Sequence, residues 1–173
     1  LEVMSLDDVL FVNINKYVNK NIATIEVRGA VKEPGYYNMS ENSTLEELIN
    51  NLDFIDVYTW LAVLEQFDSS KLERTIKLFS LNDKDSYKSF KLLPNSQVYF
   101  ANINSIDFDA FSGDSIESFN ISDLSKSIVK EYSLTINHNN KVYTIPIAGN
   151  FNVDSIVKFL GLDMSTVSST ATY

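Results

Sequence analysis

The stretch from Ala23 to Leu52, ATIEVRGAVKEPGYYNMSENSTLEELINNL, constrains the fold more than any other part of the chain. Ile25 and Val27 alternate with Glu26 and Arg28, which is the period of a strand buried on one face. Turn residues and then a helical pattern follow at once. The stretch therefore predicts a strand, a tight turn, a second strand and a helix, with little chain between them.

The turn of this hairpin is expected around Gly29 and the Pro34-Gly35 pair, because glycine and proline punctuate regular elements. Pro-Gly suits the centre of a type II turn, where glycine tolerates positive φ. We expect Ile25–Arg28 and Tyr36–Met39 to pair antiparallel on either side of it.

The helix is expected from about Thr44 to Leu52. Ser43 and Glu46 have the spacing of a capping box at its start. Apolar residues then recur at i, i+3, i+4 and i+7, which forms one stripe along a helix: Leu45, Leu48, Ile49 and Leu52. A hairpin that leads directly into a covering helix is the opening of a β-grasp domain, so the predicted fold class is α+β.

The same stretch resembles a known family. The pattern V-x-G-x-V-x-x-P-G-x-Y, followed by T-L-x-E-L-I, is similar to the SLBB (soluble-ligand-binding β-grasp) domain. The matching residues are Val27, Gly29, Val31, Pro34, Gly35, Tyr37, Thr44, Leu45, Glu47, Leu48 and Ile49. Ala62–Asp68, Arg74–Leu81 and Leu92–Phe100 resemble the later strands of the family, so the resemblance covers Ile25 to about Phe100.

The chain departs from the family pattern at three places. Asn51-Leu52 stands where a Gly-Gly pair usually follows the helix, and Pro94-Asn95-Ser96 stands in place of Pro-Gly-Asp. Gln66 or Phe67 falls where the family has an arginine in the third strand. We therefore carry no ligand contact over from those positions.

A second unit is expected downstream. Leu134 and Ile136, then Val142 to Ile147, read as a hairpin around His138-Asn139-Asn140. Asn152 or Asp154 is placed to cap a helix that ends at Gly161. This helix repeats the four-residue stripe of the first: Val153, Ile156, Val157 and Leu160. Repetition of one unit is typical of a stacked array.

These patterns divide the chain into four parts. Leu6–Val12 resembles the closing strand of a preceding unit, so residues 1–20 are assigned to that strand. Residues 21–105 form the SLBB-like domain, 106–130 a connector, and 131–173 a partial or degenerate β-grasp-like unit. The chain begins with leucine, so we expect it to be an excised fragment.

The connector is less regular. Ile116, Phe119 and Ile121 are consistent with a strand that crosses to the second unit, and Asp123–Val129 with a short helical turn.

The composition of the chain limits the kinds of partner that it can bind. A net charge of −9 argues against nucleic acid or an anionic membrane surface, and no apolar run reaches the roughly 18 residues of a membrane span. The chain has no cysteine, so it has no thiolate metal site. His138 is the only histidine, which leaves it without a second imidazole for a metal. We expect no catalytic residue, no metal and no cofactor.

Aromatic side chains are the candidate contacts for a glycan or a second subunit: Tyr36, Tyr37, Tyr58 and Trp60. Tyr36 and Tyr37 should face opposite sides of their strand, so one is expected in the core and the other in solvent. Ordinary core packing is the alternative for Tyr58 and Trp60.

What the resemblance implies is a non-enzymatic periplasmic domain of a bacterial outer-membrane polysaccharide-export protein, contributing to a ring or conduit. Its partners would be polysaccharide, copies of itself, or both, and the full-length protein would be attached to the outer membrane. Two alternatives remain, because fold does not fix function. One is a soluble module that binds a small ligand or glycan, and the other is a surface scaffold repeat.

Overall fold

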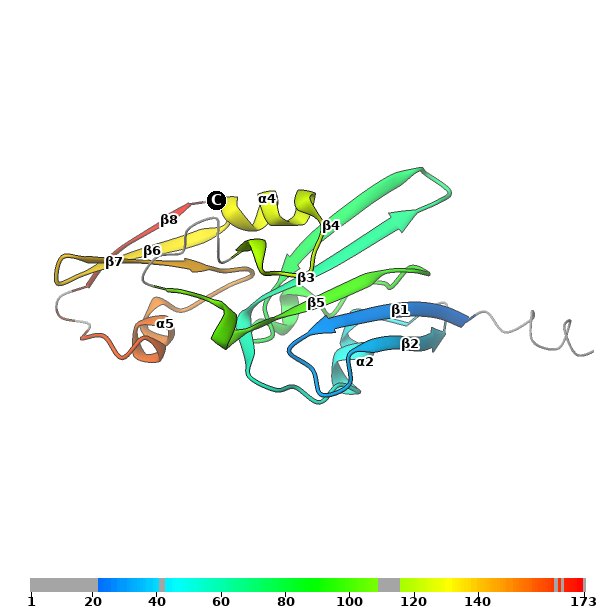
Figure 1. The fold of residues 1–173 in the computed structure, drawn as a ribbon, viewed down its shortest axis with the longest axis horizontal. Helices are drawn as coiled ribbons and strands as arrows, with labels where there is room; N and C mark the ends of the chain where they lie inside the picture. The colour runs from blue at the N-terminus through cyan, green and yellow to red at the C-terminus, as the bar shows by residue number, and fades with distance from the viewer. Residues whose placement is uncertain (1–21, 41–42, 109–115, 164, 166, 173) are drawn as a thin grey trace, which may run out of the picture.

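The computed structural model describes residues 22–40, 43–108, 116–163, 165 and 167–172. It is a mixed α+β structure with a five-stranded sheet and a three-stranded sheet. Figure 1 shows the larger sheet at one end of the molecule and the smaller sheet, with α5, at the other. The predicted α+β class is confirmed.

The strands of the larger sheet are β1 (Ile22–Gly29), β2 (Gly35–Ser40), β3 (Val57–Asp68), β4 (Glu73–Phe79) and β5 (Gln97–Asn102). Those of the smaller sheet are β6 (Ser133–His138), β7 (Lys141–Pro146) and β8 (Val167–Thr172). The helices are α2 (Leu45–Asn50), α4 (Asp123–Glu131) and α5 (Val153–Phe159), with 3₁₀ turns η1 (Lys84–Ser86) and η2 (Ile103–Ser105).

The five strands lie in the order β2-β1-β5-β3-β4. β1 and β2 pair antiparallel with Ile25 opposite Tyr37, which confirms the predicted hairpin. β5 returns to the centre and pairs parallel with β1, with Val27 opposite Val98. β3 then pairs antiparallel with both β5 and β4.

Helix α2 covers one face of this sheet, as predicted, and Leu45, Leu48 and Ile49 are its buried residues. The cap differs by one position from the prediction. Thr44 is the N-cap: its hydroxyl accepts from the Glu47 backbone N–H at 3.3 Å, and the Glu47 carboxylate accepts from the Thr44 N–H at 3.1 Å. Ser43 is instead buried and hydrogen-bonded to Ser40.

The predicted type II turn at Pro34-Gly35 is wrong. Gly35 has a φ of 147° and already pairs with Val27 as the first residue of β2, whereas the third residue of a type II turn has a φ near about +80°. The connection is a wider loop, held by a bridge between Val31 and Phe54. The Tyr37 hydroxyl of β2 donates to the Glu33 carbonyl of this loop at 2.6 Å.

Gly29 is required where β1 ends beside β5. Its φ is 88°, and a Cβ added there would lie 2.0 Å from the Phe100 carbonyl oxygen. The next residue, Ala30, donates its N–H to that same oxygen at 2.9 Å. The glycine of the sequence motif is therefore needed so that two backbones can approach closely.

The second hairpin and its helix also form as predicted. β6 and β7 pair antiparallel with Leu134 opposite Ile145, and Asn139 and Asn140 both have positive φ, as a two-residue turn of type I′ requires. Asn152 is the N-cap of α5. β8 adds a third strand on the other side of β6.

The expected crossing strand at Ile116, Phe119 and Ile121 is wrong. Residues 116–117 are helical and 118–121 form a turn and bends, so Ile116 and Phe119 enter the core from a compact turn in which the Phe119 N–H donates to the Ile116 carbonyl. The helix expected after them is present as α4, capped by Ser122.

Two hydrophobic cores lie on opposite faces of the larger sheet. The first, under α2, contains Ala62 and Leu64 of β3 and Val98 and Phe100 of β5. The second contains the intervening residues of the same strands, and it joins them to the smaller sheet, α4 and α5. These second-core residues are Tyr58, Leu61, Val63, Tyr99 and Ala101. β3 from Leu61 to Leu64 and β5 from Val98 to Ala101 are thus buried on both faces.

The strand predicted at Leu6–Val12 lies outside the described residues.

The close approach at Gly29 gives a prediction with a matched control. Gly29→Ala should destabilise the protein by about 3 kcal/mol or more, because backbone strain and overpacking of the Phe100 carbonyl add. Gly161→Ala has a similar φ of 68° but open space around the new Cβ, so its cost should be limited to about 1–2 kcal/mol of strain. Urea denaturation measures both, and equal losses would contradict the close approach.

Candidate functional site

The four candidate aromatic residues are not brought together. Tyr36 is 74% exposed on β2, whereas Tyr37 is half-buried and packs against the first core. The expected alternation is thus confirmed. Tyr58 is a core residue of β3: its hydroxyl donates to the Pro146 carbonyl at 2.8 Å, and burial raises the pKa of Tyr58 well above its usual value.

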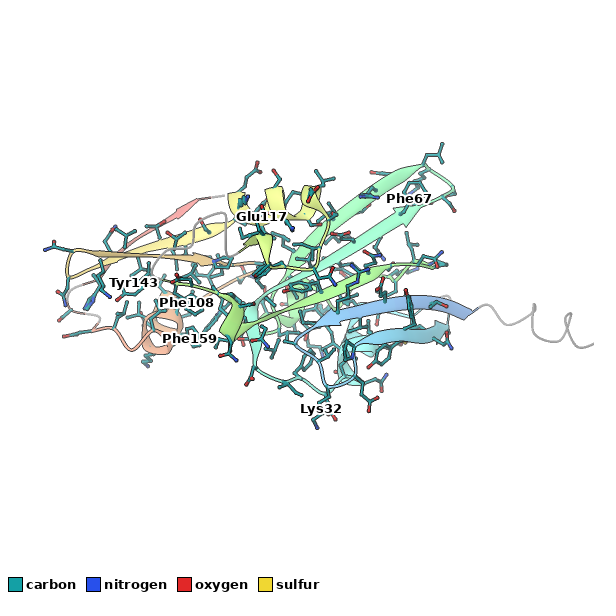
Figure 2. The ribbon with its side chains drawn as sticks, viewed as in Figure 1. Lys32, Phe67, Phe108, Glu117, Tyr143 and Phe159 are labelled. Atoms are coloured by element: carbon teal, nitrogen blue, oxygen red, sulfur yellow. The ribbon has the colours of Figure 1, made fainter. Side chains whose placement is uncertain are left out.

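Trp60 is partly buried at the rim of the second core. Its ring meets the ring of Phe159 edge-on, with the ring centres 4.8 Å apart. Phe159 also contacts Phe108, and Figure 2 labels both side chains where α5 approaches the segment after β5. Trp60 therefore presents one part of its ring to the core and another to the surface.

The second face of the larger sheet is left open beyond the second core. One row of side chains crosses all five strands in register there. The row consists of Tyr36, Glu26, Gln97, Glu65 and Ile76. We call this region, with the adjacent Arg28, Phe67 and Arg74, the open sheet face.

The polar groups at one side of the open sheet face bind one another. Arg28 donates from Nε and Nη2 to the two carboxylate oxygens of Glu26, each at 2.8 Å. Gln97 donates to the same carboxylate at 3.2 Å. The hydrogen bond and charge of Glu26 raise the pKa of Arg28. This bidentate pair fixes both side chains flat on the sheet.

Glu65 lies at the boundary between the open sheet face and the second core. Its carboxylate accepts from the Ser122 backbone N–H at 2.9 Å and from the Ser122 hydroxyl at 2.8 Å. Partial burial opposes ionisation, but hydrogen bonds from Ser125 and Ser122 outweigh it, so the pKa of Glu65 is lowered. A carboxylate at the start of α4 also suits the positive end of the helix dipole.

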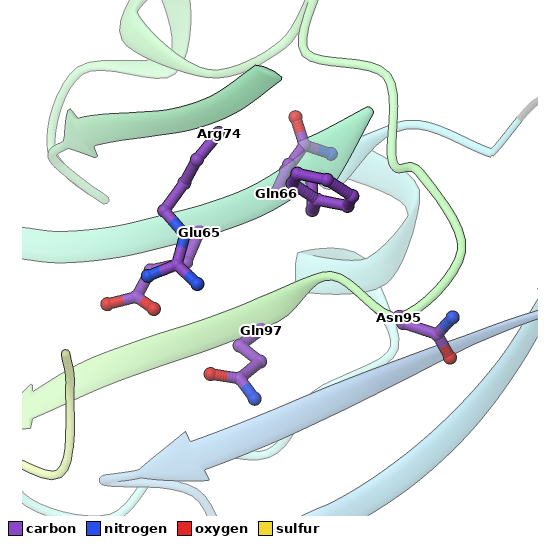
Figure 3. A pocket seen from close by; sticks show the side chains of 6 residues that line it. Glu65, Gln66, Arg74, Asn95 and Gln97 are labelled. Atoms are coloured by element: carbon purple, nitrogen blue, oxygen red, sulfur yellow. The ribbon is translucent and has the colours of Figure 1, made fainter. Parts of the chain in front are cut away.

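A small pocket of about 120 Å³ opens on this face beside Glu65. Figure 3 shows the Arg74 side chain extending from β4 toward Glu65, and the charge of Arg74 helps to lower the pKa of that carboxyl group. The lining residues are Glu65, Gln66, Phe67, Arg74, Asn95 and Gln97. The side chains of this pocket present hydrogen-bond donors and acceptors to a polar surface, but the volume of the pocket is small.

Gln66 and Asn95 are uncharged residues of this pocket. Gln66 is 6% exposed, and its amide donates to the Ser96 hydroxyl at 3.0 Å and to the Lys91 carbonyl at 2.9 Å. Asn95 has a φ of 63°, in the left-handed region that asparagine tolerates better than most residues. Gln66 and Ser96 are therefore a neutral pair whose hydrogen bonds are made within the fold.

A second pocket, of about 140 Å³, lies beside the loop between β1 and β2, but Gly29, Pro34 and Gly35 of the predicted motif turn are not among its lining residues. Pro34 is exposed, while Gly29 and Gly35 are set by the backbone as described above. The lining residues are Lys32, Glu33, Tyr37, Asn51 and Asp53. Lys32 forms an exposed ion pair with Asp53 at 3.2 Å, and such surface pairs contribute little stability.

A third and larger cavity, of about 490 Å³, lies beside Trp60. We call it the Trp60 cleft. Its lining residues are Trp60, Asn82, Asn150, Phe151, Asn152 and Ser155. Of the three cavities, only this one falls within the range of about 300–1,000 Å³ that is typical of small-molecule sites.

Sequence reasoning found Trp60 and Tyr36 but missed most residues of these surfaces. Glu65 carries a signal, because it is the one charge within the apolar run Trp60–Phe67. The Asn150-Phe151-Asn152 sequence alternates amides with an aromatic ring, but nothing in the sequence places it beside Trp60.

Within the described residues, no group of three or more histidine, cysteine, aspartate or glutamate side chains is placed to hold a metal ion. None of the described helices is both long and apolar enough to cross a bilayer. Comparison of the chain with protein-family models, with curated proteins and with solved structures found no match.

The carboxylate of Glu65 gives a pH-dependent prediction. A lowered pKa means that Glu65 stabilises the fold above its unfolded pKa of about 4.3, and that this contribution is lost as the pH falls through the lower folded value. Glu65→Gln should therefore destabilise the protein by about 1 kcal/mol at neutral pH, a modest value because the site is partly exposed. The difference from the wild type should vanish in acid.

Urea denaturation at pH 7 and pH 3 measures this difference. Glu73→Gln, which alters an exposed carboxylate at the start of β4, serves as the control and should have little effect at either pH. If both variants behave alike, Glu65 does not anchor α4.

Proposed function

We propose that the chain is a non-enzymatic part of a polysaccharide-export protein, in which β-grasp units of the SLBB type assemble with copies of themselves into a ring or conduit. The protein acts in the periplasm and is attached to the outer membrane in its full-length form. Its partners are other copies of this chain and the polysaccharide that passes along the assembly.

The observation that carries this proposal is the topology of the larger sheet. The strand order β2-β1-β5-β3-β4, with β1 and β5 parallel at the centre and α2 over one face, supports the proposal of a β-grasp unit. Two of the residues that carry the SLBB resemblance support the proposal. Gly29 stands at the close contact between β1 and β5, and Leu48 is fully buried under the sheet.

The electrostatics of the open sheet face favour a structural role over glycan hydrolysis. Glycosidases pair a carboxylate with a carboxylic acid whose raised pKa keeps its proton. Here the pKa of Glu65 is lowered, and Glu26 is held in a bidentate pair with Arg28. The lowered pKa of Glu65 is the opposite of what a general acid requires.

Exposed apolar side chains stand at opposite ends of the larger sheet. Leu72, 79% exposed, lies at the tip of the β3–β4 hairpin, with Phe67 on β3 nearby. Ile55, 47% exposed, lies just before β3 and hence at the other end of that strand. Contact between two different ends is heterologous, which is the kind of interface that closes a ring.

Leu72 provides a clean test because its φ is 54°. Asparagine adopts positive φ more readily than leucine, so Leu72→Asn removes apolar surface without disturbing the hairpin. In sedimentation velocity over a range of concentrations, the wild type should self-associate. The variant should do so roughly tenfold more weakly or worse, as expected for losing one buried leucine from an interface.

Val142→Thr on β7 is the control, since Val142 is also exposed but lies on the smaller sheet; its association should match the wild type. In cells that produce the protein, Leu72→Asn should lower the polysaccharide on the cell surface while its synthesis continues. A chain that stays monomeric at every concentration, or unchanged export, contradicts the assembly role.

A further inference from the structure

The Trp60 cleft is built from three segments that are distant in sequence. β3 supplies Trp60, the loop after β4 supplies Asn82, and the segment from Asn150 to Ser155 supplies the remaining wall. The β3 backbone holds the other two segments in place: the Trp60 carbonyl accepts from the Ala148 N–H at 2.9 Å, and the Thr59 carbonyl accepts from the Leu81 N–H at 2.8 Å.

Asp83 locks the two loops to each other. Its carboxylate accepts from the Asn150 N–H at 2.7 Å and from the Asp85 N–H at 3.1 Å. Gly149 lets the loops come this close, since a Cβ at that position would lie 2.8 Å from the Asp83 carboxylate. Backbone hydrogen bonds and the Asp83 carboxylate therefore fix the cleft before a ligand enters, which lowers the entropy cost of binding. The carbonyl oxygen of the Asn152 side chain is already used, because it accepts from the Asp154 N–H at 2.8 Å.

The chemistry of the lining is uncharged. The described residues that line the cleft are two aromatic side chains, three amides and one hydroxyl, and no Lys, Arg, Asp or Glu is among them. Asn82, Asn150, Asn152 and Ser155 are all exposed. The Asn82 amide donates to the Thr59 hydroxyl at 2.7 Å, which orients it and leaves its carbonyl oxygen for a further bond.

From this arrangement we infer that the Trp60 cleft binds a neutral sugar unit of a glycan. The exposed parts of the Trp60 and Phe151 rings offer apolar surface to the C–H face of a pyranose, and the amides and Ser155 hydroxyl offer paired donors and acceptors to its hydroxyl groups. An acidic sugar would bring a negative charge to a protein of net charge −9 without a cation among the described lining residues to receive it.

This inference goes beyond the assembly role and does not depend on it. The cleft lies where β3 begins, at the end of the larger sheet that also carries Ile55, whereas Leu72, whose substitution tests self-association, lies at the opposite end of the sheet. Sugar binding and self-association are therefore separate measurements, and either can fail while the other succeeds.

The chain contains one tryptophan, so its fluorescence reports on this cleft directly. The whole chain is titrated with neutral oligosaccharides of gluco, galacto and manno configuration, and with oligogalacturonate as the anionic counterpart. A saturable change in Trp60 emission is expected with at least one neutral series, and a weaker response or none with the anionic one.

Asn150→Ala and Ser155→Ala should each weaken the binding about 2- to 10-fold, the factor for one neutral hydrogen bond. Asn50→Ala, an exposed asparagine on α2, is the matched control and should bind as the wild type does. Sedimentation of the same samples shows whether self-association is intact. No saturable response to any neutral sugar, a preference for the anionic one, or binding that neither cleft variant weakens would overturn the inference.

Discussion

The burial of β3 and β5 on both faces is the constraint on which the rest of the structure depends. Leu64 and Phe100 point into the core under α2, while Val63 and Tyr99 point into the core shared with the smaller sheet. A strand covered on both sides is a continuous apolar run, and it cannot be exposed on either face without a large loss of hydrophobic free energy. Each core therefore requires the other layer to be in place.

The repeated hairpin and helix contribute to a core that they share with the first sheet. The second hairpin packs across the back of the first sheet, and contacts such as the Tyr58–Pro146 hydrogen bond join the two. Arg28 reaches the Asn120 carbonyl at 3.4 Å, and Glu65 holds the start of α4. The segment expected to connect two units contributes Ile106, Ile116 and Phe119 to the core between them.

The sequence predicted local structure well because local patterns determine it. Both hairpins, α2 and α5 follow from alternation, caps and four-residue stripes, and they form where those patterns place them. The errors arose where several signals competed. Thr44 and Ser43 are both suitable caps, and only packing decides between them. β3 begins at Val57 rather than near Ala62, because a strand buried on both faces loses the alternation that marks its start.

The candidate sites were less predictable, because they depend on contacts between residues that are distant in sequence. The Trp60 cleft joins residues up to 95 positions apart, from Trp60 to Ser155, through backbone hydrogen bonds that carry no side-chain signal. Tyr36 and Glu65 share a row on the open sheet face only because β1 and β5 lie between their strands. Spacing along the chain therefore revealed the aromatic residues but not their neighbours.

Native-state hydrogen exchange of Leu48→Ala tests most directly whether the two cores form one cooperative unit. Leu48 is fully buried in the first core, so the substitution should cost about 2–5 kcal/mol. If the two cores form one cooperative unit, the slowest amides of β6, on the far side of the shared sheet, should lose the same free energy of protection as those of β1. Loss confined to α2, β1 and β2, with β6 unchanged, would contradict it.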